Sequence, residues 1–211
     1  MLGNISSLFF LRNLFSVINI RRYLKIISYN KNLQKTLNVN INDFKRITGK
    51  YIIGGINGYG KEYDSKDSLL FEGEYLKGKR NGTGREYGKY GEVKFEGEYL
   101  NGMRHGKGKE YNSEGRLIFE GEYLNGEKNG KGKEYNCFTG KIRFEGEYLN
   151  GKEWNGKSYN GNNEIECEVK NGNGYIKKYN DGGELKSEGF YVNGKKNGKV
   201  IKYHWSNKKK I

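Results

Sequence analysis

The sequence predicts an all-β protein, an elongated single-sheet meander of about seven β-hairpins preceded by a small α-helical N-terminal segment. The hexapeptide FEGEYL recurs at Phe71, Phe95, Phe119 and Phe144, at intervals of 24, 24 and 25 residues. Within each copy the residue types alternate with a period of two, which is typical of a strand. The chain has 33 Gly and no Pro, and Asn-Gly pairs follow most copies, as hairpin turns require.

Weaker copies extend the repeat in both directions. ITGKYI begins at Ile47, IECEVK at Ile165 and SEGFYV at Ser187. The seven expected units therefore begin near residues 47, 71, 95, 119, 144, 165 and 187. This divides the chain into an N-terminal segment, 1–46, and a repeat region, 47–211.

Each unit has a second half that predicts the return strand of a hairpin. After FEGEYL the chain reads KGKRNG, which is expected to form the turn, and then TGREY; NGTGREY, HGKGKEY and NGKGKEY are successive versions of this half. Phe71, Gly73 and Tyr75 are expected on one face, and the glutamates and Leu76 on the other. The strand glycines leave room for rings from neighbouring strands, so the Phe and Tyr side chains are expected to stack along one face.

The repeated pattern Phe-Glu-Gly-Glu-Tyr-x-Asn-Gly, followed by Gly-x-Gly-x-x-Tyr, resembles the MORN repeat. NGKKNGK, from Asn193 to Lys199, resembles the related YwqK-type repeat variants. The resemblance covers about 165 of 211 residues. It implies a non-enzymatic scaffold that binds proteins, and in some members phospholipids.

GKEWNGKS, from Gly151 to Ser158, matches the phosphate-binding pattern G-x-x-x-x-G-K-[ST]. In the repeat frame, however, Gly151 corresponds to Gly78, and Asn155-Gly156 corresponds to Asn81-Gly82. A phosphate-binding loop precedes a helix, whereas YNGNNEIECE follows Ser158 and does not start one. The sequence therefore predicts a hairpin here and no nucleotide site.

No other residue is predicted to be catalytic or to bind a cofactor or a metal. His105 stands where Asn stands in other units and is expected in a turn; His204 lies in the last strand, VIKYHW. Cys137 is expected in a loop and Cys167 in a strand, and two cysteines form neither a disulfide framework nor a zinc cluster. The paired glutamates of FEGEY are expected to pair with lysines of neighbouring strands. The chain is therefore predicted not to be an enzyme.

Residues 1–46 are strongly basic, with eight Lys or Arg and one acid. Leu8, Leu11, Phe15 and Ile18 form an amphipathic helical stripe. Three roles are open for this segment: a cap on the sheet, a mitochondrial transit peptide or membrane-surface helix in residues 1–42, or an F-box-like element. The third rests on a resemblance of LFSVI and YNKNLQKTL to the F-box, which implies a Skp1-type adaptor bound through residues 5–39 and a substrate-adaptor role in a ubiquitin ligase.

The expected partner is another protein, with anionic phospholipid as the alternative. The net charge of +14 favours anionic surfaces. Nucleic acid is not expected, because acids alternate with bases throughout the repeats. An unpaired terminal strand would allow a homodimer. The expected location is the cytoplasm, free or at a membrane surface, with no cofactor.

Overall fold

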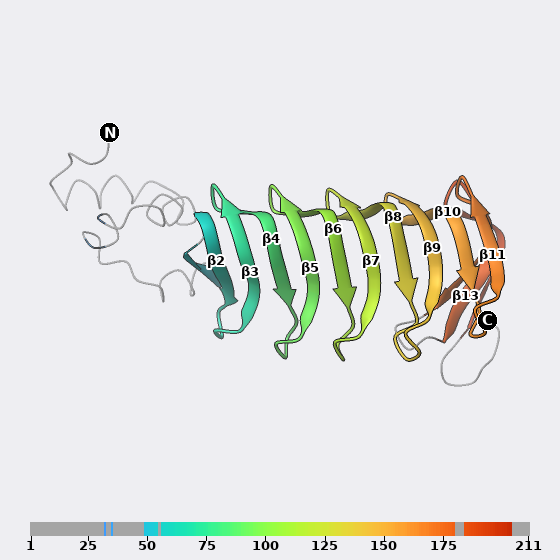
Figure 1. Cartoon of the computed structure of the whole chain (residues 1–211), viewed down its shortest axis with the longest axis horizontal. Helices are drawn as coiled ribbons and strands as arrows, with labels where there is room; N and C mark the ends of the chain where they lie inside the picture. The colour runs from blue at the N-terminus through green and yellow to red at the C-terminus, as the bar shows by residue number, and fades with distance from the viewer. Residues whose placement is uncertain (1–31, 33–34, 36–48, 55, 180–183, 204–211) are drawn as a thin grey trace.

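The computed structural model describes residues 32, 35, 49–54, 56–179 and 184–203. It confirms the predicted all-β meander: one open sheet of 14 strands in sequence order, with all adjacent strands antiparallel (Figure 1). The first eight strands are β1 Lys50–Gly54, β2 Asn57–Asp64, β3 Leu69–Leu76, β4 Lys79–Tyr87, β5 Val93–Leu100, β6 Met103–Tyr111, β7 Leu117–Leu124 and β8 Glu127–Tyr135. The last six are β9 Ile142–Leu149, β10 Lys152–Tyr159, β11 Ile165–Lys170, β12 Asn173–Tyr179, β13 Leu185–Val192 and β14 Lys195–Lys202.

The predicted N-terminal helices, with the cap, transit-peptide and F-box-like roles assigned to them, lie outside the described residues, except that Asn32 and Lys35 are helical. In the part of the chain that the structure describes, no helix has the length and apolar character needed to cross a membrane.

Two-residue turns close six of the hairpins. Both turn residues have positive φ, for example 50° at Lys77 and 71° at Gly78, as a type I′ turn requires. The turn pairs are Lys77-Gly78, Asn101-Gly102, Asn125-Gly126, Asn150-Gly151, Asn171-Gly172 and Asn193-Gly194.

The other half of KGKRNG does not form the turn, contrary to the expectation from sequence. Asn81-Gly82 lies inside β4, where the pairing with β3 shifts register between Gly73 and Tyr75, and Gly82 has φ 89°. An Asn-Gly pair tolerates positive φ equally well in a turn and in a β-bulge, so its composition alone did not distinguish the two.

Successive turns are hydrogen-bonded to one another along one edge of the sheet. The Gly102 N–H donates to the Arg80 carbonyl at 2.8 Å, and the Gly126 N–H donates to the Arg104 carbonyl at 2.9 Å. Asparagine side chains add a second set of bonds, in which the side-chain oxygen accepts the N–H of the next turn. These pairs are Asn57 with Lys77, Asn81 with Asn101, Asn129 with Asn150, Asn155 with Asn171, and Asn173 with Asn193, at 2.8–3.4 Å.

The core is a single row of aromatic rings on one face, as the alternation predicted. Phe71, Phe95, Phe119 and Phe144 are fully buried. Each of the first three contacts a tyrosine of the next unit edge to face, such as Phe71 with Tyr99 at 5.0 Å between ring centroids. The glycines make this possible, because a Cβ built on Gly84 would lie 2.3 Å from the Phe71 ring.

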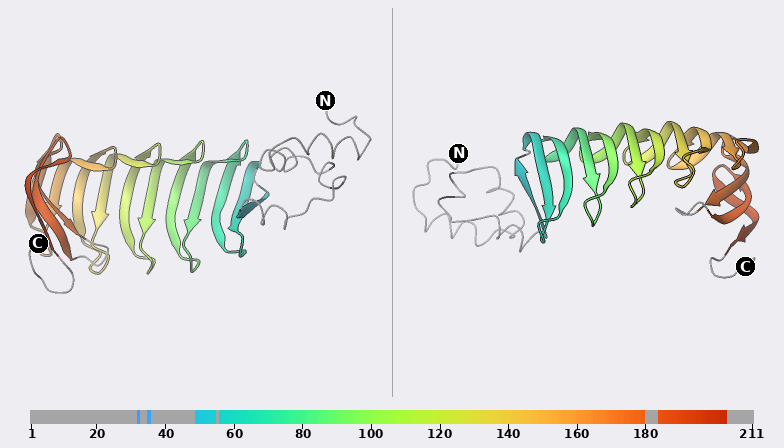
Figure 2. Two further views of the ribbon diagram at one scale, coloured as in Figure 1. Left: turned by 180° about the vertical axis from the view of Figure 1, so that it is seen from behind. Right: turned by 60° about the horizontal axis from the view of Figure 1, so that its bottom comes forward.

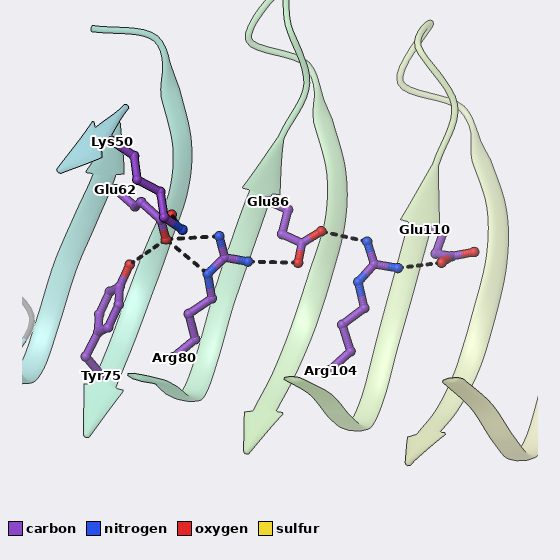
Figure 3. Close-up of polar contacts among 7 residues, drawn as sticks. All are labelled: Lys50, Glu62, Tyr75, Arg80, Glu86, Arg104 and Glu110. Carbon is purple, nitrogen blue, oxygen red and sulfur yellow. Dashed lines mark hydrogen bonds and ion pairs between the residues drawn. The ribbon is translucent and has the colours of Figure 1, made fainter. Parts of the chain in front are cut away.

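Charged side chains form a row across the strands on the same face as these rings (Figure 3). Arg80 bonds Glu62 and Glu86, and Arg104 bonds Glu86 and Glu110, at 2.6–3.0 Å. The Arg80 guanidinium lies 4.2 Å from the centre of the Phe71 ring, and Arg104 lies 4.1 Å from Phe95. Lys128 lies 3.9 Å from the centre of the Phe119 ring, so cations cover three of the four phenylalanines that this one-layer sheet buries.

The last strands depart from this plan. Trp154 is an extra residue at a bulge in β10, and Glu153 stands opposite Tyr148, where earlier units have Arg80, Arg104 or Lys128. Figure 2 shows the C-terminal hairpins turned away from the plane of the preceding strands. Their core consists of Val169, Ile176 and Tyr191.

Candidate functional site

The phosphate-loop-like string GKEWNGKS forms a turn and a strand. Gly151 is the second turn residue, Lys152–Tyr159 is β10, and the next element is the strand β11. The helix N-terminus that would hold a phosphate does not follow this string.

The other residues singled out in the sequence lie apart from one another. His105 lies in β6 at a bulge, not in a turn, and its Nδ1 is buried without a hydrogen-bond partner in the described structure. Cys137 is a buried loop residue and Cys167 lies in β11, both as expected; His204 is outside the described residues. Among the described residues, no three His, Cys, Asp or Glu side chains are placed to hold a metal ion.

The main concave feature is a groove of about 980 Å³ on the face opposite the aromatic rings. It crosses the strands from Tyr59 in β2 to Glu147 in β9. Its floor consists of the glycines that pair across the strands, namely Gly73, Gly84, Gly97, Gly108, Gly121, Gly132 and Gly146.

The glycine floor connects the core to the groove. On one side of the sheet these glycines make room for the buried rings, and on the other side they leave the backbone uncovered. The residues before and after each glycine point to the groove side and form two walls.

The first wall alternates acid and base. It consists of Glu72, Arg85, Glu96, Lys109, Glu120, Lys133 and Glu145. Ion pairs neutralise much of it, including Arg85 with Glu96 at 3.3 Å and Lys133 with Glu145 at 3.0 Å. The prediction that the glutamates pair with bases of neighbouring strands is confirmed for these pairs.

Tyrosine hydroxyl groups also hold the first wall. Tyr87 donates to Glu72 and Tyr111 donates to Glu96, both at 2.6 Å. The hydrogen bond from Tyr87 is the main cause that lowers the pKa of Glu72. Burial, together with this bond to Glu72, raises the pKa of Tyr87 to about 12. The first wall is therefore rigid and close to neutral.

The second wall differs: the register places Lys107 opposite Glu122 and Lys131 opposite Glu147, as predicted, but the expected ion pairs do not form among these described residues. Its glutamates accept hydrogen bonds from neutral groups: Glu74 from the Thr83 hydroxyl at 2.8 Å, Glu98 from the Lys107 backbone N–H at 3.1 Å, Glu122 from the Lys131 backbone N–H at 2.8 Å, and Glu147 from the Asn155 amide at 2.8 Å. In the described part of the chain none of these four carboxylates has a cation within ion-pair distance. At Glu98 and Glu122 the bulge turns a backbone donor toward the carboxylate, whereas Glu74 and Glu147 accept from side chains.

A row of exposed leucines lies beyond the second wall on the same face. It consists of Leu76, Leu100, Leu124 and Leu149, which are 39–49 % exposed. The groove side of the sheet thus offers an uncovered backbone floor, unneutralised carboxylates and an apolar margin. Sequence reasoning assigned these residues to one face but missed the groove; its signal was the glycine between the two glutamates of every FEGEYL.

Comparison with known proteins identifies the repeat. Four segments match the family described as MORN repeat: residues 71–90, 95–115, 119–136 and 188–199. These segments lie in the hairpins β3–β4, β5–β6, β7–β8 and β13–β14. No curated protein matches the chain.

Two solved structures resemble part of the chain only distantly. One is TarM, with 14 % identity and a TM-score of 0.33 over 63 % of this chain. The other is a mutant of S. aureus TarM in complex with fondaparinux, α-GlcNAc-glycerol and UDP, with 15 % identity and a TM-score of 0.35 over 64 % of this chain. The chain spans 27 % of the length of each, and the likeness carries no functional argument. The four segment matches, together with the hairpin geometry, support assignment of the repeats to the MORN-repeat family.

Proposed function

We propose that the repeat sheet is a non-enzymatic scaffold that binds a segment of a partner protein in the glycine-floored groove. The groove itself carries the proposal, since it extends across eight consecutive strands, β2 to β9. Binding sites for polypeptides are commonly elongated grooves lined by alternating pockets and polar groups.

The chemistry of the groove supports a polypeptide ligand. Glu98 and Glu122 offer exposed or half-exposed carboxylates, Thr83 offers a hydroxyl, and the exposed leucines offer apolar surface. A peptide presents basic, polar and apolar side chains on one backbone and can meet all three surfaces at once.

The test is selection of binders from a random peptide library, followed by obstruction of the groove. Thr83→Trp places a large ring on the groove wall, whereas Lys89→Trp places the same ring in the exposed β4–β5 loop. We expect Thr83→Trp to weaken the selected peptides at least tenfold and Lys89→Trp to leave their affinity within twofold. Equal affinities for the two variants would refute the groove as the site.

A separate observation favours anionic phospholipid as a second candidate ligand. The loops at the edge opposite the two-residue turns carry exposed aromatic rings beside bases: Tyr90 is 85 % exposed next to Lys89, and Phe138 is 59 % exposed near Lys141. Aromatic rings at the headgroup level and bases facing anionic lipid are typical of membrane-surface binding.

Flotation on liposomes tests this candidate. Binding through the loop edge predicts flotation on phosphoinositide-containing vesicles that falls with salt and with the double variant Tyr90→Ser/Phe138→Ser, while neutral vesicles bind no protein. Flotation that persists in this variant would place lipid binding elsewhere in the chain. The absence of flotation at physiological salt would reject the lipid candidate.

A further inference from the structure

We propose that the groove binds a polypeptide in the polyproline II conformation that carries a basic side chain at every third residue. This inference rests on the proposed function, because it specifies the partner of the same groove. Three properties of the described residues carry it: the spacing of the second-wall carboxylates, their lack of ion-pair partners, and the uncovered floor.

The spacing of the carboxylates selects the conformation. Glu98, Glu122 and Glu147 line the groove from alternate strands, β5, β7 and β9, and Glu74 of β3 continues this row beyond the groove lining. Strands are about 4.8 Å apart, so neighbouring carboxylates recur every ~9.6 Å along the groove. A polyproline II helix rises ~3.1 Å per residue with three residues per turn, which gives ~9.3 Å between side chains on one face.

Other regular conformations fit this spacing less well. Same-face side chains of an extended strand recur every ~6.8 Å. Seven residues of an α-helix advance ~10.5 Å, so a helix would be ~2.7 Å out of step after three intervals, from Glu74 to Glu147. The polyproline II helix is out of step by only ~0.9 Å over the same distance.

The charge of the second wall selects basic side chains. Its four glutamates are held by neutral donors, and the same wall contributes only two bases to the groove, Lys107 and Lys131. In the first wall, by contrast, ion pairs neutralise Glu72, Glu96 and Glu145. A ligand with evenly spaced bases therefore finds acceptors along one wall and no competing acidic row on the other.

The floor and the ends suit a proline-rich backbone. The floor glycines carry no side chains, and their peptide groups already form hydrogen bonds across the strands. The floor therefore offers a ligand contact surface and no hydrogen-bonding groups. A polyproline II segment suits such a floor, because its own backbone has no internal hydrogen bonds. The carbonyl groups of such a ligand are free to accept from the wall lysines Lys107 and Lys131. At the β2 end Tyr59 is 60 % exposed and lines the groove, and an exposed aromatic ring is the surface on which proline-rich segments dock.

The experiment compares synthetic peptides by fluorescence anisotropy with the full chain. The probe is (Pro-Pro-Lys)4, which spans ~37 Å, about the length of the groove. The matched control is Pro8Lys4, which has the same composition and charge with its lysines in one block. We expect the periodic peptide to bind at least tenfold more tightly, a difference of about 1.4 kcal/mol, and to lose that advantage at high salt.

Paired charge-neutral variants locate the binding. Glu98→Gln/Glu122→Gln keeps an acceptor for the two backbone N–H groups, so the bulges are preserved. Glu114→Gln/Glu164→Gln removes the same charge from exposed loops outside the groove. The first pair is expected to weaken the periodic peptide at least tenfold, and the second by less than twofold, with unchanged far-UV circular dichroism in both.

The outcomes separate this inference from the proposed function. Equal affinity for the periodic and block peptides, or equal effects of the two variant pairs, would overturn the polyproline II inference. If the periodic peptide does not bind but library-selected peptides still depend on the groove through Thr83→Trp, this inference fails and the proposed function stands. If no selected peptide depends on the groove, both fail.

Discussion

Substitution of a floor glycine should destabilise the sheet through the ring beneath it. A Cβ added at Gly108 would lie 2.3 Å from the Phe95 Cζ atom and 2.6 Å from its Cε2 atom, about 1.1 Å inside the 3.4 Å at which ordinary contact begins. Phe95 cannot move away easily, because it is fully buried between the Tyr123 edge and the Arg104 guanidinium. Overpacking of this kind costs about 1–3 kcal/mol, and we expect Gly108→Ala to lie near the upper end.

Urea unfolding followed by far-UV circular dichroism measures this cost. The matched control is Gly161→Ala, because Gly161 has no atom near its added Cβ and no positive φ; this variant should be neutral or more stable by up to ~1 kcal/mol. In a Phe95→Leu background the clash is relieved, so Gly108→Ala should cost less than ~1 kcal/mol. If Gly108→Ala matched Gly161→Ala, or cost the same in both backgrounds, the proposed packing of ring on glycine would be wrong.

Three further predictions follow from the described contacts. Asn81 and Asn129 accept a hydrogen bond from the N–H of the next turn, and His105→Asn should supply the same acceptor to the Asn125 N–H. The urea midpoint should rise by the equivalent of ~0.5–1.5 kcal/mol. An unchanged midpoint would show that this hydrogen bond does not form. Arg104→Met removes the cation that Glu86 and Glu110 share and leaves each with one other cation, Arg80 or Lys128. This variant should cost about 2 kcal/mol, and a cost below ~0.5 kcal/mol would contradict a structural role for the charged row. Burial raises the pKa of Glu86, but the hydrogen bond from Arg104 and its positive charge lower this pKa by more. The pKa of Glu86 in the folded protein is therefore below its ordinary value. The ionised Glu86 carboxylate therefore stabilises the fold above its unfolded pKa of ~4.3, and this stabilisation is lost as the pH falls through the pKa of the folded state. Glu86→Gln should thus reduce the loss of stability on acidification, measured by urea unfolding from pH 6 to 3.

The strand content, the order of the hairpins and the aromatic face could all be predicted from sequence, because each depends on a local pattern. The alternation in FEGEYL placed Phe71 and Tyr75 on one face, and the burial of both confirms it. The strand glycines predicted space for a ring from a neighbouring strand, and the Phe71 ring of β3 occupies that space at Gly84 of β4.

The details that depend on register could not be predicted in the same way. Asn81-Gly82 has the composition of a turn, and only the pairing of β3 with β4 shows that it forms a bulge. The equivalent bulges of β6 and β8 turn backbone donors toward Glu98 and Glu122, and these glutamates do not form the expected ion pairs. The positions of Arg80 and Arg104 over the rings were missed for the same reason, because each lies beyond a register shift, whereas Glu86 and Glu110 stand opposite phenylalanines by regular pairing.

The hydrogen bonds between successive turns give the protein an adjustable length. Each turn is fastened to the unit before it by a backbone bond, such as Gly102 to Arg80, so a unit joins the sheet through contacts that every unit can repeat. Removal of residues 95–118 would join Lys94 to Phe119. Lys94 is the bulge residue before one FEGEYL sequence, and it would then stand before the next FEGEYL sequence, so the strand pairing of the remaining units would be kept. In-frame loss or duplication of one such unit in the gene would thus change the span of the binding surface by ~9.6 Å without redesign of its chemistry.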